Sequence, residues 1–401
     1  MRVLSVIIIP PHMKVSGAVN AAMSLNKMIS KKIQLDVAVM SEKNSSEYQD
    51  NLKIYKFKSF NFFSYFRKKV PDKYLTMFYT SKISNFIKKK KYDLVHFHNI
   101  LPSIELKRCA TACIKENIPY IISSHGFNEL LYNVDSYNFR FYEKLFWYLF
   151  IKLPLNFTIK NAKAIFTLYP DEKNIIYKKF RFPKKKIFLI TNGVNENKKK
   201  LITKDNLEIT LKKFKINYYK TKNIPIYIFV GNHTPNKGID ALYEIFSKLN
   251  SEFYLIICGS KRPKYKNLYD KFYKLNQKNQ KIIITDYLND FEIINLMHTS
   301  NFFIYPTRGD TLPLVILDAM MIGLPVISTK VGGIPYQLKN NCGCIIDPNN
   351  ISQAIKLIKK LESSKSRRIQ ISKKAKRRVL KNFSWNNSAS QSIEIYNKII
   401  I

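Results

Sequence analysis

One apolar segment, from Phe302 to Gln337, constrains the fold most strongly. It reads FFIYPTRGDTLPLVILDAMMIGLPVISTKVGGIPYQ. Its pattern predicts a buried strand over 302–305, a polar loop, a helix over 314–323 and a second apolar strand over 326–329. Strand, helix and strand, joined by turns that contain glycine, form the repeating unit of parallel sheets. The chain is therefore expected to be an α/β protein.

Two carboxylates lie eight positions apart in this segment. Asp310 is in the polar loop, and Asp318 is in the helix among apolar residues. A buried ionised acid is costly unless it is paired or hydrogen-bonded. Either Asp318 lies on a solvated helix face, or both carboxylates accept hydrogen bonds from the hydroxyls of a bound polyol. The amides at the helix start would face an anion or sugar oxygens. The helix-start residues expected in such a site are Thr311, Leu312, Pro313 and Leu314.

This segment resembles the donor-sugar motif of the retaining glycosyltransferases of family 4, which have the GT-B fold. In that family two acids at this spacing are followed by an Ala-Met pair, a Gly-x-Pro-Val-Ile strand and a Gly-Gly-x-Pro turn. The sequence keeps that order from Asp310 to Pro335. It differs in having Asp at both acid positions, where Glu is usual, and Tyr336 in place of a Glu. The resemblance implies that Asp310 holds the donor sugar's hydroxyls and Asp318 the ribose of the nucleotide.

A second candidate loop follows a strand that ends at Gly231. Lys237-Gly238 starts a helix there, and an ammonium beside helix-start amides suits a diphosphate. A capping glycine beside a solvated lysine would give the same pattern. The loop resembles the family's Gly-Arg-x-x-x-x-Lys-Gly motif, with Asn232 in place of the Arg. Three residues are candidates for supplying the missing positive charge: Arg308, Lys261 and Arg262.

Three further site residues come from the resemblance. Gly17 lies where the family has a glycine-rich loop near the donor pyrophosphate, and Gly259 ends a strand that resembles the one beside the base. The strand PYIISSHGF ends in His125-Gly126, which resembles the edge of the family's sugar site. His125 is thereby expected to position the donor sugar or the acceptor. His96 and His98 end the preceding strand, and for them a structural role is the simpler interpretation.

The length of 401 residues favours two domains. We expect an N-terminal Rossmann-like acceptor-binding domain over 1–195 and a polar, basic linker over 196–222. A Rossmann-like nucleotide-sugar-binding domain is expected over 223–382. The resemblance implies that the two domains face each other across a cleft and that residues 383–401 form a helix crossing back to the first domain.

The charge of the chain is strongly positive, with 68 Lys and Arg against 28 Asp and Glu, or +40. Such a charge attracts nucleic acid, anionic lipid or phosphorylated substrates. An AT-rich genome, which favours Lys, Ile, Asn, Tyr and Phe codons, would produce the same bias. Because the charge is spread along the chain and no recognition motif is present, nucleic acid is not expected as a partner.

Two segments combine basic and aromatic residues, 60–91 and 139–153. Both favour the surface of an anionic membrane, although a helix with a core-facing stripe and a lysine-rich end would explain 60–91 equally. No apolar run is long enough to span a bilayer, and the apolar start is expected to be a first strand rather than a signal peptide. The five cysteines lack zinc-site spacing and are expected to be reduced thiols in a cytoplasmic protein at the inner membrane face.

The resemblance implies a retaining, metal-independent transfer of a sugar from a nucleotide sugar, with UDP as the expected nucleotide. The acceptor is expected to be a lipid-linked or oligosaccharide substrate in bacterial surface polysaccharide assembly. His125, Asp310 and Lys237 are the expected catalytic residues. The nucleotide sugar is a substrate, no cofactor is expected, and no Asp-x-Asp metal motif occurs. A GT-B nucleotide-sugar epimerase and a non-catalytic basic binding protein remain as alternatives. Glycoside hydrolysis is disfavoured because a phosphate-type loop accompanies the two acids.

Overall fold

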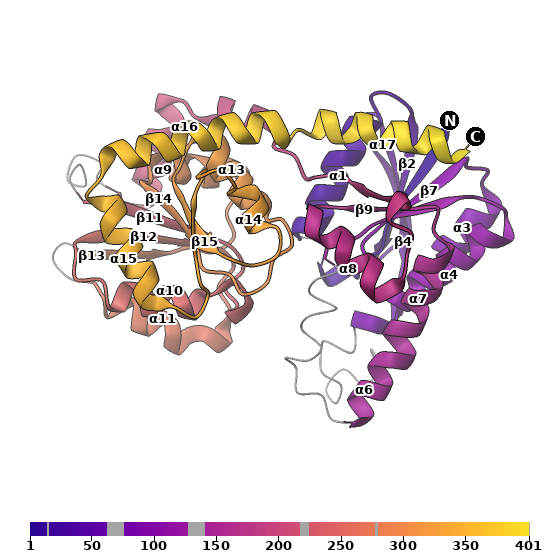
Figure 1. Cartoon of the computed structure of the whole chain (residues 1–401), viewed down its shortest axis with the longest axis horizontal. Helices are drawn as coiled ribbons and strands as arrows, with labels where there is room; N and C mark the ends of the chain where they lie inside the picture. The colour runs from indigo at the N-terminus through magenta and orange to yellow at the C-terminus, as the bar shows by residue number, and fades with distance from the viewer. Residues whose placement is uncertain (14–15, 62–75, 127–140, 217–223, 277–279, 401) are drawn as a thin grey trace. The chain divides into compact units, whose positions relative to one another are not determined.

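The computed structural model describes residues 1–13, 16–61, 76–126, 141–216, 224–276 and 280–400. The chain divides into two compact units. Unit 1 contains residues 1–193 together with 385–401, and unit 2 contains residues 194–384 (Figure 1).

Unit 1 is built on an eight-stranded sheet in the order β10-β9-β8-β7-β1-β2-β4-β3. All neighbouring strands are parallel except β3 and β4. The strands are β1 (Arg2–Ile7), β2 (Gln34–Ser41), β3 (Ser45–Gln49), β4 (Leu52–Lys58), β7 (Leu94–His98), β8 (Tyr120–Ser123), β9 (Ala164–Thr167) and β10 (Ile187–Leu189). The register pairs Ile7 with His98 and His98 with Ser123. The carboxyl ends of β1, β7 and β8 therefore lie side by side.

The helices of unit 1 pack on this sheet. Helix α1 contacts α17, whereas α3, α4 and α7 pack in a row. Their bounds are α1 (Gly17–Ile29), α3 (Ile83–Lys89), α4 (Ser103–Lys115), α6 (Phe141–Trp147), the π-helical turn η4 (Tyr148–Lys152), α7 (Leu153–Asn161), α8 (Pro170–Phe180) and α17 (Trp385–Ile400). A short antiparallel pair, β5 (Phe60–Asn61) and β6 (Tyr79–Thr80), accompanies them.

Unit 2 has a six-stranded sheet in the order β13-β12-β11-β14-β15-β16, with every pair parallel. The strands are β11 (Ile226–Val230), β12 (Phe253–Cys258), β13 (Gln280–Ile284), β14 (Phe302–Tyr305), β15 (Val326–Thr329) and β16 (Cys344–Ile346). This is the doubly wound order 3-2-1-4-5-6, in which the direction of winding reverses between β11 and β14. Ligands of such sheets bind at the carboxyl ends of the strands at that point of reversal.

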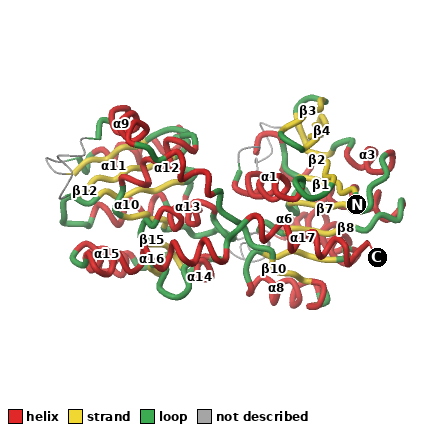
Figure 2. The backbone as a smooth tube through the Cα atoms, turned by 90° about the horizontal axis from the view of Figure 1, so that it is seen from above, coloured by secondary structure: helices red, strands yellow, loops and turns green. Residues whose placement is uncertain are grey.

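Helices flank the strands of both units (Figure 2). In unit 2, α12 contacts α9 and α13, and α13 contacts α16, while α10 contacts α11 and α15. The bounds are α9 (Lys204–Lys213), α10 (Ile239–Ser247), α11 (Lys266–Tyr273), α12 (Asp290–Thr299), α13 (Leu314–Ile322), α14 (Ile334–Gln337), α15 (Ile351–Glu362) and α16 (Lys365–Asn382). The predicted α/β class with two Rossmann-like sheets, and with the C-terminal helix in the first unit, is confirmed.

The segment expected as a linker, 196–222, differs from that expectation in its described part. It forms the 3-10 helix η6 (Glu196–Leu201) and then α9, both of which pack on α12 and belong to unit 2. Helix α9 begins there because the side chain of Thr203 caps it, accepting a bond of 3.2 Å from the amide of Asn206. The chain crosses between units at 193–194 and again at 384–385, and Val194 and Ser384 form a parallel bridge.

Within the segment 60–91, the apolar side chains of Tyr79, Ile83, Phe86 and Ile87 face the core. Ile83 and Ile87 are fully buried, Phe86 is partly buried, and the exposed residues of α3 are polar: Asn85, Lys88 and Lys89. For α3, the alternative of an ordinary helix with a core-facing stripe and a lysine-rich end therefore holds, whereas Phe60 in the same segment is 65% exposed. Residues 62–75 and 139–140, on which the membrane interpretation also rested, lie outside the described residues. All five cysteines are buried and unpaired. Among the described residues, no helix is long and apolar enough to cross a membrane.

Candidate functional site

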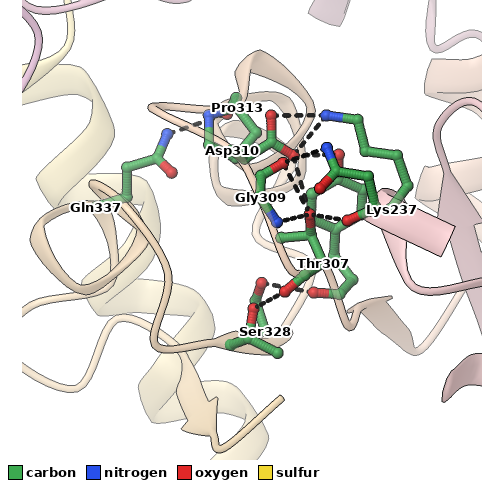
Figure 3. A network of polar contacts seen from close by, with 10 residues as sticks. Lys237, Thr307, Gly309, Asp310, Pro313, Ser328 and Gln337 are labelled. Carbon is green, nitrogen blue, oxygen red and sulfur yellow. Dashed lines mark hydrogen bonds and ion pairs between the residues drawn. The ribbon is translucent and has the colours of Figure 1, made fainter. Parts of the chain in front are cut away.

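The two strands at the point of reversal carry an ion pair at their carboxyl ends. Lys237 ends the 3-10 turn η7 (Pro235–Lys237), which follows β11, and Asp310 lies in the loop that follows β14. The Lys237 ammonium lies 2.7 Å from both oxygens of the Asp310 carboxylate (Figure 3). Both side chains are largely buried, so the pair is less screened by solvent than a surface pair. The predicted phosphate loop and the predicted sugar loop are thus joined directly.

The Asp310 carboxylate is further fixed by hydroxyl groups. Tyr305 at the end of β14 donates to Oδ2 at 2.7 Å, and Thr307 donates to it at 3.3 Å. The carbonyl oxygen of Thr307 accepts a bond of 2.5 Å from Thr329, the last residue of β15. Three neighbouring parallel strands therefore hold one carboxylate in place.

Two glycines allow the loops to approach each other this closely. Gly238 has φ +76°, and a Cβ there would lie 1.9 Å from the carbonyl oxygen of Pro306. Gly332 has φ +52°, and a Cβ there would lie 1.9 Å from the carbonyl oxygen of Asp310. Both conformations are ones that glycine adopts without strain. Neither position accepts a side chain unless the Asp310 loop moves.

The N-terminus of α13 lies at the end of the loop that carries Asp310. The helix begins at Leu314 with Pro313 as its N-cap, and no side chain caps it. The Pro313 carbonyl oxygen accepts a bond of 3.0 Å from Gln337, and that of Thr311 accepts one of 2.6 Å from the Gly333 amide. These two bonds tie the loop before α13 to α14 and its N-cap. Uncapped first-turn amides at a fixed helix start suit an anion or sugar oxygens.

Asp318, inside α13, has a partner that local pattern did not reveal. Its Oδ2 lies 2.8 Å from the Lys198 ammonium, which also lies 3.2 Å from Asp290. Burial raises the pKa of the Asp318 carboxyl, and the positive charge of Lys198 opposes that rise. Asp318 is thus a buried acid with a counter-charge, rather than an acid on a solvated face. Lys198 lies in the segment expected as a linker, and no sequence signal links it to a residue 120 positions away.

The residue at the position of the family's arginine and the three candidates for supplying its charge differ in their surroundings. Asn232 is exposed at the start of the η7 loop. Arg308 donates to the Pro235 carbonyl oxygen at 2.8 Å and forms an ion pair of 2.7 Å with Asp240. The Arg308 guanidinium thus lies near the loop of Lys237, but it is already paired with Asp240. The other two candidates for the missing charge, Lys261 and Arg262, are exposed residues after β12.

The residues expected beside the base form a close backbone contact. A Cβ at Gly259 would lie 2.0 Å from the carbonyl oxygen of Gly231, so the ends of β12 and β11 touch there. Sequence reasoning missed His233 in this place. His233 is fully buried, its Nδ1 lies 3.0 Å from the Tyr269 hydroxyl, and its Nε2 has no hydrogen-bond partner among the described residues. Burial lowers the pKa of His233 to about 4.

Gly17 and His125 belong to unit 1. Gly17 is the first residue of α1, whose start is capped by the Ser16 side chain. His125 follows β8 in a left-handed conformation, φ +41°, and its Nε2 lies 3.1 Å from Nδ1 of His98. His96 is fully buried between the hydroxyls of Tyr396 and Ser123, at 2.7 Å from each. His96 is therefore structural, as expected, whereas His98 contacts a candidate site residue.

No metal-ligand cluster is found in the described part of the chain. No three His, Cys, Asp or Glu side chains come together there as metal ligands would. Metal independence stays a prediction.

Two family models match complementary parts of the sequence. Residues 15–198 match the model described as Glycosyltransferase Family 4, and residues 208–378 match Glycosyl transferases group 1. Their junction lies close to the first crossing between units. The chain belongs to the group 1, family 4 glycosyltransferases. The resemblance on which the residue assignments rest is therefore confirmed at the level of the family.

Relatives of this family 4 glycosyltransferase include two Escherichia coli proteins. UDP-Gal:alpha-D-GlcNAc-diphosphoundecaprenol alpha-1,3-galactosyltransferase is 24% identical over 79% of the chain and 78% of its own length. The O-antigen biosynthesis glycosyltransferase WclY is 25% identical over 77% and 80%. The crystal structure of Anabaena Alr3699/HepE in complex with UDP matches with a TM-score of 0.74 at 14% identity, over 99% of this chain and 100% of that one. The fold is thereby GT-B.

The sequence prediction that Lys237 contacts a nucleotide diphosphate has a direct test. Replacing Lys237 with Ala is then expected to weaken binding of free UDP by about tenfold, because one charge-assisted contact would be lost. Isothermal titration would measure the affinity. Lys248→Ala is the matched control, since Lys248 is an exposed lysine just beyond α10. Unchanged affinity of the Lys237 variant would contradict a diphosphate role for this residue.

Proposed function

We propose that this glycosyltransferase moves a sugar from a UDP-sugar to an acceptor hydroxyl with retention of anomeric configuration. The observation that carries the proposal is the ion pair of Lys237 with Asp310 where the winding of the unit 2 sheet reverses. It lies where doubly wound sheets bind nucleotides. The complexes of HepE with UDP and with UDP-glucose support the choice of nucleotide.

The leaving nucleoside diphosphate needs its developing negative charge neutralised. A lysine ammonium has three N–H donors, and Asp310 accepts from Lys237 through both of its oxygens. A remaining donor and the first-turn amides of α13 would bind the diphosphate. Asp310 would then accept from sugar hydroxyls while it holds Lys237 in place. In this scheme the leaving phosphate helps to deprotonate the acceptor on the same face.

Asp318 is proposed to bind the nucleotide ribose. Lys198 bonds to its Oδ2, and a carboxylate offers about four acceptor sites. The carboxylate can therefore keep its counter-charge and still accept from ribose hydroxyls. Lys198 favours the ionised form of Asp318, which accepts hydrogen bonds more strongly than a protonated acid.

The acceptor is proposed to be lipid-linked, in the assembly of a bacterial surface polysaccharide such as capsule, O-antigen or lipopolysaccharide. The Escherichia coli relatives support this class, since one is named for a diphosphoundecaprenol-linked acceptor and the other for O-antigen biosynthesis.

The purified chain, incubated with a UDP-sugar panel and a short-chain lipid-diphosphate sugar acceptor, is expected to release UDP and form a new glycoside. Proton NMR of the fresh product should show the same anomeric configuration as the donor. The same rate in the presence of EDTA is expected for a metal-independent reaction. An inverted anomer would overturn retention, and conversion of the donor without acceptor would favour the epimerase alternative.

Asp318→Asn is expected to lower transfer at least about a hundredfold without unfolding the chain, because the amide keeps the shape but loses the charge that binds hydroxyls. Asp290→Asn is the matched control. It removes the other acid beside Lys198, one that is exposed and has no proposed substrate contact. Transfer rates and thermal melting of both variants would be compared. Full activity of Asp318→Asn would remove the proposed ribose role.

We also propose that unit 1 docks on an anionic membrane through one helical face. Helices α6 and α7 are joined by η4 into one rod, in which α7 packs beside α4 and the α6 end points away from the sheet of unit 1 (Figure 1). Large apolar side chains are exposed along this rod at intervals of about four residues. They are Phe141, Leu145, Tyr148, Leu149, Leu153 and Phe157. Phe141 is 84% exposed, a high value for a side chain of this kind.

The π turn helps to keep these side chains on one side. Four residues of an α-helix exceed a full turn by about 40°, so a stripe with this spacing drifts around the helix. A π turn takes in more residues per turn, which offsets the drift at η4. Ile151, Leu155 and Ile159 of the same rod are buried. The exposed stripe is therefore additional to the face that packs on unit 1.

The basic residues beside the stripe match an anionic surface. Lys144, Lys152 and Lys160 are exposed on the same rod. Lys107 lies over the Phe157 ring at 5.2 Å. An apolar face bordered by lysines is the pattern of helices that lie in the interface of a membrane.

Leu145→Glu combined with Leu149→Glu is expected to reduce sedimentation with phosphatidylglycerol-containing vesicles by about tenfold or more, because two apolar side chains no longer enter the interface. The control is Ile369→Glu with Leu380→Glu, which changes two exposed apolar residues of α16 in unit 2 by the same charge. Equal loss in both double variants would mean that net charge alone governs binding. Equal binding to purely zwitterionic vesicles would contradict the anionic preference.

A further inference from the structure

Two histidines at the carboxyl ends of neighbouring strands of unit 1 form a hydrogen bond. His98 is the last residue of β7 and pairs in register with Ser123, the last residue of β8. His125 follows two residues later, where φ +41° turns the backbone out of the strand. Nδ1 of His98 lies 3.1 Å from Nε2 of His125, and the ring centroids are 5.4 Å apart. His98 is fully buried, whereas His125 is partly exposed.

A hydrogen bond between two imidazoles requires a proton on one nitrogen and a lone pair on the other. Burial lowers the pKa of His98 well below its ordinary value and that of His125 to about 4. Both rings are therefore neutral near pH 7, and each carries one N–H. Two arrangements remain, which differ in which histidine donates.

The second nitrogen of His98 distinguishes the two arrangements. His98 Nε2 is buried and has no hydrogen-bond partner among the described residues. If His125 donated to His98, the single proton of His98 would lie on Nε2 as a buried N–H without an acceptor. Buried N–H groups without a partner are rarer in native proteins than acceptors left partly unused. If His98 donates instead, Nε2 is only an unused lone pair.

We propose that His98 donates from Nδ1 and thereby holds His125 in the tautomer that carries its own proton on Nδ1. His125 then offers a neutral N–H donor to an oxygen of the substrate. Its Nε2 lone pair accepts from His98, so His125 does not act as a base through that atom. His98 is a positioning residue in this scheme. The inference rests on the proposed function together with the expectation, drawn from the family resemblance, that His125 positions the donor sugar or the acceptor.

The neighbouring histidine makes a separate set of contacts. The His96 ring lies against that of His98, with centroids 4.0 Å apart, but its two nitrogens contact Tyr396 and Ser123. His96 therefore anchors α17 and β8 without bonding to either nitrogen of His98. A variant at Tyr396 perturbs this cluster while leaving the bond between His98 and His125 in place.

Nitrogen NMR of the full chain labelled with 15N-histidine tests the tautomer directly. The six histidines can be assigned by single substitutions. We expect a protonated Nδ1 and an unprotonated Nε2 for both His98 and His125 at neutral pH. A protonated Nε2 on His125 would overturn the proposal, whether or not the chain transfers sugar.

Kinetics of His98 variants test the consequence. His98→Leu removes the donor and is expected to lower kcat by about tenfold or more, with little change in the KM for the UDP-sugar, and to populate the other His125 tautomer. His98→Asn, whose side-chain N–H₂ lies close to the position of Nδ1, should recover most of the rate. Tyr396→Phe should lower the melting temperature but leave the His125 tautomer unchanged.

The outcomes separate this inference from the proposed function. Absence of transfer by the unmodified chain with every donor and acceptor would defeat the proposed function, while the NMR spectrum would still decide the tautomer. Transfer by the unmodified chain, with the same kcat and the same His125 tautomer in His98→Leu, would overturn the role of His98 alone.

Discussion

The bond between the Lys237 ammonium and the Asp310 carboxylate connects the two loops on either side of the point where the unit 2 sheet reverses its winding. The loop after β11 carries the lysine, and the loop after β14 carries the acid. Gly238 lets the first loop touch Pro306, and Gly332 lets the turn after β15 touch Asp310. The positions of the uncapped α13 amides follow from the same contacts. A shift of any one of these loops would move the others, so the site behaves as one preorganised unit.

The supply of positive charge in this site is limited. The family motif has an arginine where Asn232 stands, and the guanidinium of Arg308 is shared with Asp240. Lys237 already has a carboxylate partner. A diphosphate bound here would therefore depend more on backbone amides than in a site with a free arginine. Amides at a helix start carry partial positive charge whose position is fixed by the fold and which needs no counter-ion.

Sequence reasoning found those parts of the structure that local pattern determines. The segment from Phe302 to Gln337 forms β14, α13 and β15, because two apolar runs and a glycine-terminated helix leave little choice. The sequence did not decide whether Ile83 and Ile87 face the core or a membrane, because an apolar stripe has the same spacing in both cases. Helix α9 was missed because its apolar residues are few. Its stability comes from the Thr203 cap and from packing on α12, which the linear pattern does not display.

The pairings between residues far apart in the sequence could not be predicted from local pattern, for a different reason. Lys198 reaches Asp318 across 120 positions, and only the fold of unit 2 brings them together. His98 and His125 are 27 positions apart, and their contact depends on the register of β7 with β8 and on a left-handed residue after the strand. Residue types at strand ends indicated where polar groups gather. They did not indicate which side chain would donate to which.

In the proposed docking of unit 1 on a membrane, the excess of basic residues acts together with the apolar stripe on α6, η4 and α7. A charge of +40 attracts any polyanion, and an AT-rich genome would produce it without selection for binding. Electrostatic attraction of exposed lysines is screened over about 8 Å at physiological salt, so it brings a surface near a membrane without fixing which side faces it. Exposed Phe141, Leu145 and Leu149 exert no attraction at a distance. Burying these side chains in the membrane interface is favourable, so they act only on contact. The two features together would orient unit 1, because the lysines attract the membrane before contact and the stripe determines which face of unit 1 touches it.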